Sequence, residues 1–381
     1  LLLAGRTFRA LGEPDRAGKA FAAAWDVARE AELVSEQADA LCRLGMFDYL
    51  NGRLRHAKER FVEALHVAEA GEDRRAQAWA LQHLAWVSTT LGDFAEADSA
   101  LGRAARLFAL QRDRMGRAWV RSSAAFTRLL AGRLREAKRL AEAFRPFGEK
   151  VGDTWAVGML RGVGAYAAAE LGDLADADAL ARKAYRDFDR IADDWGRGFT
   201  LVVRTVVARD LGELEHAVEL VTEAEVFAES TGHPLLMGMA RNLHGHCLLG
   251  LGDAAGAEAA AKTILSLALP HEVLEPVKVG PLALLAEARA AQGDTSSALR
   301  WFGQLAAHAD APALLYARKR VVARYAQLLA ADGQVDEARI WARRALDAPG
   351  EDASSNALAA EVREQLGVEE EPSDQQIPAL P

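Results

Sequence analysis

Glycine recurs along this 381-residue chain at an almost constant spacing. Seven of the eight intervals are 40 residues long and one is 41, and the glycines are Gly12, Gly52, Gly92, Gly132, Gly172, Gly212, Gly252, Gly293 and Gly333. An alanine follows each by five residues, at Ala17, Ala57, Ala97, Ala137, Ala177, Ala217, Ala257, Ala298 and Ala338. Such a period is typical of repeat proteins, in which each unit is one supersecondary element. We therefore expect nine stacked units rather than one central core.

Each unit has the pattern of two helices that meet at the glycine. The glycine ends an apolar stretch and suits the left-handed conformation of a helix end, and Asp or Glu often follows and suits a helix start. The alanine falls early in the second helix, where a small side chain allows close packing. Polar breaks such as Gly71-Glu72-Asp73 mark the turns between units. The pattern predicts an all-α solenoid of nine antiparallel helix pairs over residues 1–348.

Two segments depart from the regular pattern. The 41-residue interval contains Pro270, Pro276 and Pro281, which predict a longer loop or a bend there. Residues 349–381 are expected to form a short capping helix, from an N-cap at Asn356 through Gln365, and then an acidic flexible tail.

The overall charge and composition argue against several classes of protein. The net charge of −9 and the pI near 5.6 disfavour direct nucleic-acid binding, which rests on basic patches. No apolar run reaches the roughly 18 residues of a membrane helix. Two cysteines, Cys42 and Cys247, form no disulfide framework and favour a reducing, cytoplasmic location. No phosphate loop, nucleophile elbow or metal-binding motif is present, so we expect neither an enzyme nor a cofactor.

The nearest approach to a metal site is His244-Gly245-His246-Cys247. On a helix, His244 and Cys247 share a face while His246 points elsewhere, and no second cluster completes a set of four ligands. Packed histidines in a first helix are the preferred interpretation. Acidic pairs such as Asp193-Asp194 lie at repeat boundaries, where helix capping is preferred over general acid and base chemistry.

The segment Leu91-Gly92-Asp93-Phe94-Ala95-Glu96-Ala97 resembles the inter-helix turn of tetratricopeptide repeats, and a small residue seven positions before each glycine matches the family's first helix. The resemblance implies a right-handed superhelix with first helices on its concave surface. The period is longer than the family's usual ~34 residues. Repeats of this kind resemble the sensor arms of large bacterial regulators. Because the chain lacks an initiator Met, we expect an N-terminal effector domain in a longer protein.

Carrying the family's inward-facing positions over to this chain gives two rows of large side chains. The first row contains Trp79, Trp119, Met159, Phe199 and Met239, and the second contains Met46, Trp86, Phe126, Tyr166, Val206 and His246. Aromatic and Met side chains on a concave wall suit a groove for a peptide or a helix. The alternative is that longer helices turn these rows into the packing between repeats.

A third row contains Arg121, Arg161 and Arg241, each eleven residues before a glycine. The row could hold a carboxylate or a phosphate, and the alternative is a solvated ridge with local salt bridges. These patterns together favour a non-catalytic scaffold that binds a protein or peptide, as the sensor arm of a bacterial signalling or transcription-regulatory protein. The alternatives are a stand-alone peptide receptor and, more remotely, an enzyme with a dispersed site.

Overall fold

In a computed structural model, the chain is described over residues 1–10, 13–266, 274–307, 318–348 and 350–368. Those residues form helices and no strand. The first helix of each successive pair is α1 (Leu2–Ala10), α3 (Val34–Leu50), α5 (Arg74–Thr90), α7 (Arg114–Leu130), α9 (Thr154–Glu170), α11 (Asp194–Asp210), α13 (Pro234–Gly250), α15 (Leu274–Ala291) and α17 (Arg318–Ala331).

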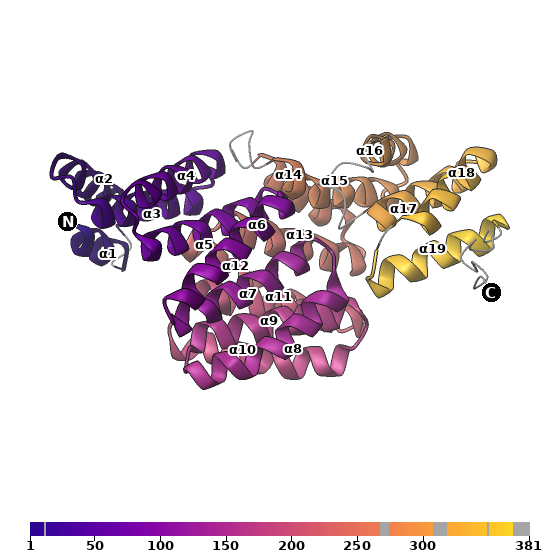
Figure 1. The fold of residues 1–381 in the computed structure, drawn as a ribbon. Helices are drawn as coiled ribbons and strands as arrows, with labels where there is room; N and C mark the ends of the chain where they lie inside the picture. Colours follow the sequence, from indigo (N-terminus) through magenta and orange to yellow (C-terminus); the bar gives the residue numbers. More distant parts are fainter. Residues whose placement is uncertain (11–12, 267–273, 308–317, 349, 369–381) are drawn as a thin grey trace, which may run out of the picture.

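The second helix of each pair packs antiparallel to the first. These helices are α2 (Pro14–Glu30), α4 (Leu54–Ala70), α6 (Phe94–Leu110), α8 (Leu134–Val151), α10 (Leu174–Arg190), α12 (Leu214–Thr231), α14 (Ala254–Ser266), α16 (Thr295–Ala307) and α18 (Val335–Asp347). A last helix, α19 (Ala353–Leu366), follows the ninth pair. Figure 1 shows the pairs along an arc, from α1–α4 on one side through α8–α10 to α17–α19 on the other. The predicted all-α solenoid is confirmed.

The periodic glycines lie at the turn inside each pair. The eight of them that are described have φ between 71° and 90°, a left-handed conformation that glycine adopts without steric cost. Gly12 lies outside the described residues. The nine alanines five positions later are at most 1% exposed. A methyl group at that place lets the two helices of a pair pack closely.

A second series of residues with a left-handed backbone conformation, also at intervals of 40 residues, lies in the turns between pairs. It consists of Glu32, Glu72, Arg112, Gly152, Ala192 and Gly232. The next residue caps the following first helix in four cases, where an aspartate accepts a hydrogen bond from a backbone N–H of that helix: Asp73, Asp113, Asp153 and Asp193. The polar breaks in the sequence therefore end one pair and start the next.

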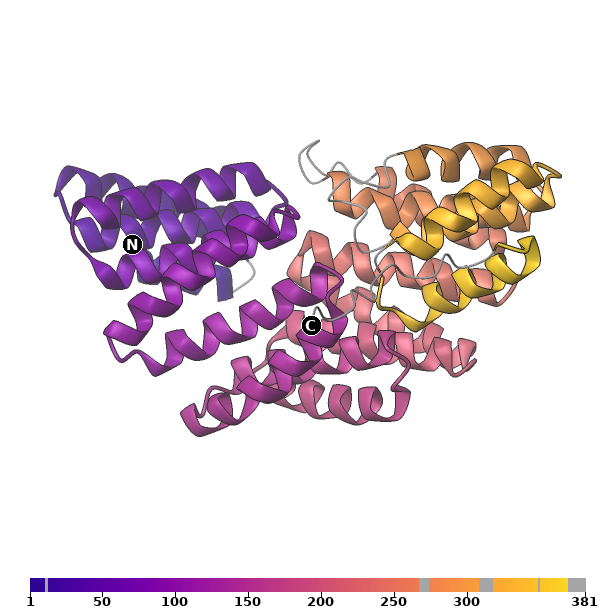
Figure 2. The ribbon, with the colours of Figure 1, turned by 45° about the vertical axis from the view of Figure 1, so that its right-hand side comes forward.

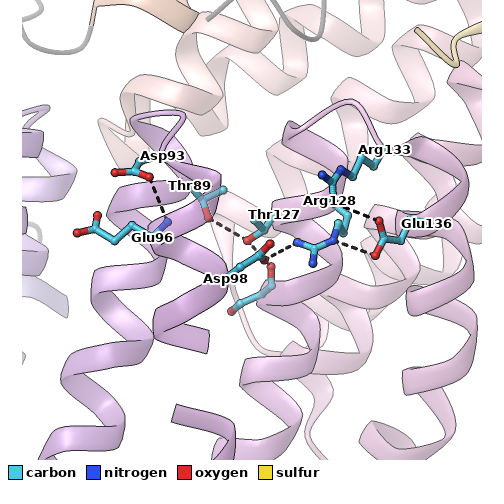
Figure 3. Close-up of polar contacts among 9 residues, drawn as sticks. Thr89, Asp93, Glu96, Asp98, Thr127, Arg128, Arg133 and Glu136 are labelled. Carbon is cyan, nitrogen blue, oxygen red and sulfur yellow. Dashed lines mark hydrogen bonds and ion pairs between the residues drawn. The ribbon is translucent and has the colours of Figure 1, made fainter. Parts of the chain in front are cut away.

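Polar contacts join neighbouring pairs near the turns inside them (Figure 3). Arg128, in α7, reaches Asp98 of α6 at 2.5 Å and Glu136 of α8 at 3.0 Å. The hydroxyls of Thr89 in α5 and Thr127 in α7 are 2.9 Å apart. These contacts link α5 and α6 to α7 and α8, and the apolar core forms successive clusters along the stack.

The arc curves far enough to bring distant pairs together. Figure 2 shows α15–α19 opposite the first six helices, with α8–α12 between them. The ring of Tyr49, in α3, lies 5.0 Å from the ring of His233, just before α13. The inner faces of the first helices therefore enclose space that no single repeat could form.

The region after the ninth pair differs in detail from the prediction. Asp352, not Asn356, caps α19, because Asp352 accepts a 2.7 Å hydrogen bond from the Ser355 N–H. The side chain of Asn356 instead accepts a hydrogen bond from Lys319 Nζ at 2.9 Å. The acidic tail from residue 369 onward lies outside the described residues.

The 41-residue interval, between Gly252 and Gly293, also differs in part from the prediction. Pro276 and Pro281 lie within α15 rather than interrupting it. Pro276 falls in the first turn, where the missing N–H has no intrahelical acceptor to lose. The predicted loop with Pro270 falls in 267–273, outside the described residues. Of the helices that the structure describes, none is long and apolar enough to cross a membrane.

Candidate binding cavity

A cavity of about 330 Å³ lies between the inner faces of the first helices. Residues from α5, α7, α9, α11, α13, α15 and α17 line it, together with Phe94 of α6, Phe302 of α16 and the start of α19. Much of its wall is apolar, with Leu129, Leu130, Val202, Val206, Leu235 and Leu243. A concave site with an apolar wall and a few polar groups is typical of ligand-binding sites.

Two arginines in the cavity wall have carboxylate partners within the chain. Arg209 Nε lies 2.7 Å from Asp210 Oδ1, and Arg320 Nη2 lies 3.4 Å from Glu287 Oε1. Burial raises the pKa of Glu287, but the charges of Arg320 and the other cations outweigh it and hold that pKa below its usual value. Glu287 is therefore ionised, and Arg320 compensates its charge.

Glu170 is an acidic group of the cavity that, unlike Glu287, has no ion-pair partner among the described residues. It ends α9, and its carboxylate has no hydrogen bond or ion pair within the described ranges. Burial raises its pKa to about 7; Arg209 opposes the shift and Asp352 adds to it. Removing a carboxylate from water is costly, and the charge of Arg209 offsets that cost only in part. A cationic group entering the cavity would relieve that cost.

Asn242 adds an unused hydrogen-bond acceptor. Its Oδ1 is buried in the wall contributed by α13 and accepts no hydrogen bond from any described residue. Buried polar atoms are almost always satisfied in folded proteins, so an orphan acceptor beside a cavity is a candidate partner for a donor on a ligand. His246, one turn further along α13, has a pKa lowered to about 4 by burial and is neutral at pH 7.

The predicted groove rows separate into three groups. Tyr166, Met239 and His246 line the cavity, as does Val206 of the second row. The side chains buried in the core, at 2% exposure or less, are Phe126, Met159 and Phe199. The remaining members are half-buried, namely Met46, Trp79, Trp86 and Trp119. A groove along the full length of both rows stays a prediction.

Many of the aromatic members pack against one another across repeats. Trp79 contacts Trp119 with ring centroids 5.8 Å apart, and Trp119 stacks on Trp155 at 4.1 Å. Phe126 contacts Trp86 at 5.4 Å and Trp195 at 6.0 Å. Sequence reasoning missed Trp155 and Trp195, although both lie 17 residues before a periodic glycine. Their shared position in the repeat was the available signal.

Comparisons with known proteins bear on the fold. No family model and no curated protein matches this chain. Its structure is similar to that of a Rap protein complexed with Competence and Sporulation Factor, with a TM-score of 0.58 and 16% identity over 72% of this chain and 74% of that one. The chain is a tetratricopeptide-like solenoid.

Two further solved structures match less well. The apo form of RapI gives a TM-score of 0.46 and 12% identity, over 87% of this chain and 98% of that one. A signal transduction ATPase with a tetratricopeptide repeat sensor, from Pyrococcus horikoshii, gives 0.44 and 15%, over 72% of this chain and 42% of that one.

The arginine row of the solenoid is mostly paired within the chain. Arg161 contacts Glu149 at 3.0 Å and also Asp187, and Arg241 contacts Glu229 at 3.0 Å. A row that binds an external anion at all three positions stays a prediction.

Of the histidines and cysteine considered for a metal, two are engaged inside the solenoid. His244 Nδ1 lies 3.1 Å from Glu225 Oε1, and Cys247 is fully buried.

Proposed function

We propose that this solenoid is a non-catalytic scaffold that binds a peptide or an extended segment of a protein in its central cavity. The proposal rests on one observation: seven successive first helices converge on a cavity that contains a carboxylate without an ion pair among the described residues, Glu170, and an acceptor without a hydrogen bond, Asn242. The similarly folded Rap protein was solved as a complex with Competence and Sporulation Factor, which supports a binding role for this architecture.

The chemistry of the wall indicates what kind of ligand fits. Apolar side chains would bury the ligand's own apolar groups, and Asn242 would accept a backbone N–H. Glu170 would pair with a cation of the ligand, and that pairing is strong where water is excluded. A peptide carrying a lysine, an arginine or a free amino terminus combines these features.

Regulation would follow from the geometry of the stack. Because each repeat contacts mainly its neighbours, a ligand that touches helices from α5 to α17 would change the curvature of the whole arc. We propose that an attached effector domain senses this change, as in the sensor arm of a bacterial signalling or transcription-regulatory protein. The buried free thiols of Cys42 and Cys247 are compatible with the cytoplasm as its location.

The test uses a peptide selected from a displayed random library against the full chain. Its affinity is then measured by fluorescence anisotropy for the wild type, for Met239→Trp, which fills the cavity, and for Met115→Trp, which adds the same bulk at a side chain 55% exposed on α7. We expect Met239→Trp to weaken binding at least tenfold, about 1.4 kcal/mol, and Met115→Trp to leave it unchanged.

A second, smaller substitution tests the same site in case the bulky Met239→Trp variant does not fold. Asn242→Ala removes the carboxamide that carries the orphan acceptor and should weaken the same peptide by roughly five- to tenfold, the range expected for one hydrogen bond. Peptides that bind both cavity variants as tightly as the wild type would place the ligand elsewhere and overturn the proposal.

A further inference from the structure

Arg121 occupies the same repeat position as Arg161 but lacks its carboxylate partners. Arg161 contacts Glu149, 12 residues earlier, and Asp187, 26 residues later. Arg241 likewise contacts Glu229, 12 residues earlier. The same offsets from Arg121 lead to alanine and phenylalanine, Ala109 and Phe147. The repeat therefore replaces both counter-charges at this one position with apolar side chains.

Aromatic rings hold the Arg121 guanidinium in place. Its Cζ lies 4.1 Å from the ring centroid of Phe147 and 5.2 Å from that of Phe144, both in α8. Arg117, one turn earlier in α7, also lies over Phe147, at 5.2 Å. The face of an aromatic ring attracts a guanidinium and restricts its orientation. The guanidinium groups of Arg117 and Arg121 therefore both contact the ring of Phe147.

No carboxylate in the described part of the chain forms an ion pair with Arg117 or Arg121, in contrast to Arg161 and Arg241. Burial lowers the pKa of Arg121, and the charge of Arg117 lowers it further. Both guanidiniums nevertheless remain protonated, since arginine does not lose its proton in proteins. Like charges one turn apart on a helix repel each other, so a negative charge bound between the two guanidiniums would stabilise the pair.

We propose that Arg117 and Arg121, seated on Phe147, form a binding site for an oxyanion, a carboxylate or a phosphate, carried by a partner polypeptide. Guanidinium groups present parallel N–H donors that match the two oxygens of such an anion. Partial burial against the rings reduces the competition from water. The site is separate from the central cavity, whose lining contains neither arginine, so it would provide a second point of attachment.

The test measures binding of a dye-labelled hexaglutamate peptide to the full chain by fluorescence anisotropy at low salt. Arg117→Gln/Arg121→Gln removes both charges. The matched control, Arg186→Gln/Arg343→Gln, removes two charges from exposed arginines. We expect the first variant to raise the Kd at least about tenfold and the control to change it less than about twofold. Phe147→Leu keeps both charges and should give an intermediate loss.

Competition then identifies the source of the oxyanion. Displacement of the peptide by inorganic phosphate at lower concentration than by acetate would assign the site to a phosphate-bearing partner, and equal displacement would assign it to acidic side chains. Equal weakening by the two double variants would reveal diffuse charge attraction and overturn the proposal, as would absence of saturable binding to the wild type. Thermal unfolding checks that each variant is folded. If Arg117→Gln/Arg121→Gln does not fold, the single variant Arg121→Gln is used in its place.

Discussion

The backbone N–H of Arg135 donates a 2.6 Å hydrogen bond to Glu351 Oε2, 216 residues further along the chain. Arg135 is the second residue of α8, where backbone N–H groups have no intrahelical acceptor and a negative charge is favourable. The contact ties the segment before α19 to the middle of the arc. Asp352, the next residue, lines the cavity, so this hydrogen bond secures one edge of the proposed binding site.

Glu351→Ala should loosen that edge without unfolding the protein. A carboxylate at a helix N-terminus contributes about 0.3–1 kcal/mol, so amide hydrogen exchange at the start of α19 and at Arg135 should become roughly two- to fivefold faster. The midpoint of thermal unfolding should barely move. Glu364→Ala, at an exposed position within α19, is the control. Identical exchange in both variants would show that the contact does not hold α19.

Ala192→Gly should stabilise the protein. Ala192 has φ 52°, and a left-handed conformation costs a non-glycine residue about 1–2 kcal/mol. The greater freedom of glycine in the unfolded chain offsets about 0.5–1 kcal/mol of that gain. The reciprocal change, Gly152→Ala at the equivalent turn, should lower the thermal unfolding midpoint. A lower midpoint for Ala192→Gly would contradict the conformational assignment.

Acid should destabilise the protein through its buried histidines. Burial lowers the pKa of His233 to about 4, against 6.5 for the free side chain. The unfolded chain therefore binds a proton that the folded chain does not, and the stabilising contribution present above pH 6.5 is lost as the pH falls through about 4. His233→Gln should flatten the fall in unfolding midpoint between these pH values. The exposed control His56→Gln should leave the slope unchanged.

Glu170→Gln should have the opposite pH dependence. Because burial raises the pKa of Glu170 to about 7, the folded state holds a proton that the unfolded state has lost above about pH 4.3. Its contribution is complete below that pH and is lost as the pH rises through about 7. Glu170→Gln should therefore match the wild type at pH 4 and exceed its unfolding midpoint at pH 8. An exposed control, Glu213→Gln, should show no such divergence.

The repeat period alone predicted the helix pairs, because glycine at the turn and alanine at the packing face are local requirements. It could not predict the depth of the aromatic rows. Phe126 and Phe199 are buried because successive first helices turn these rows toward each other and toward Trp195. That rotation depends on the curvature of the whole stack, which no single repeat encodes.

The cavity could not be predicted from the sequence either, because it depends on the curvature of the whole stack. Glu170, Arg209 and Arg320 come from three different pairs and meet only because the arc curls inward. Within their own repeats they look like ordinary polar residues near a helix end. The hydrogen bond between Glu351, just before α19, and the start of α8 is likewise a long-range contact, which no local sequence pattern predicts.

A crystal structure of the full chain with a selected peptide would show whether the ligand occupies the cavity. We predict the peptide inside the cavity, with a backbone N–H donating to Asn242 Oδ1 and a cationic group within ion-pair distance of Glu170. A peptide bound along the second helices on the outer face of the arc, with Asn242 and Glu170 untouched, would contradict this prediction.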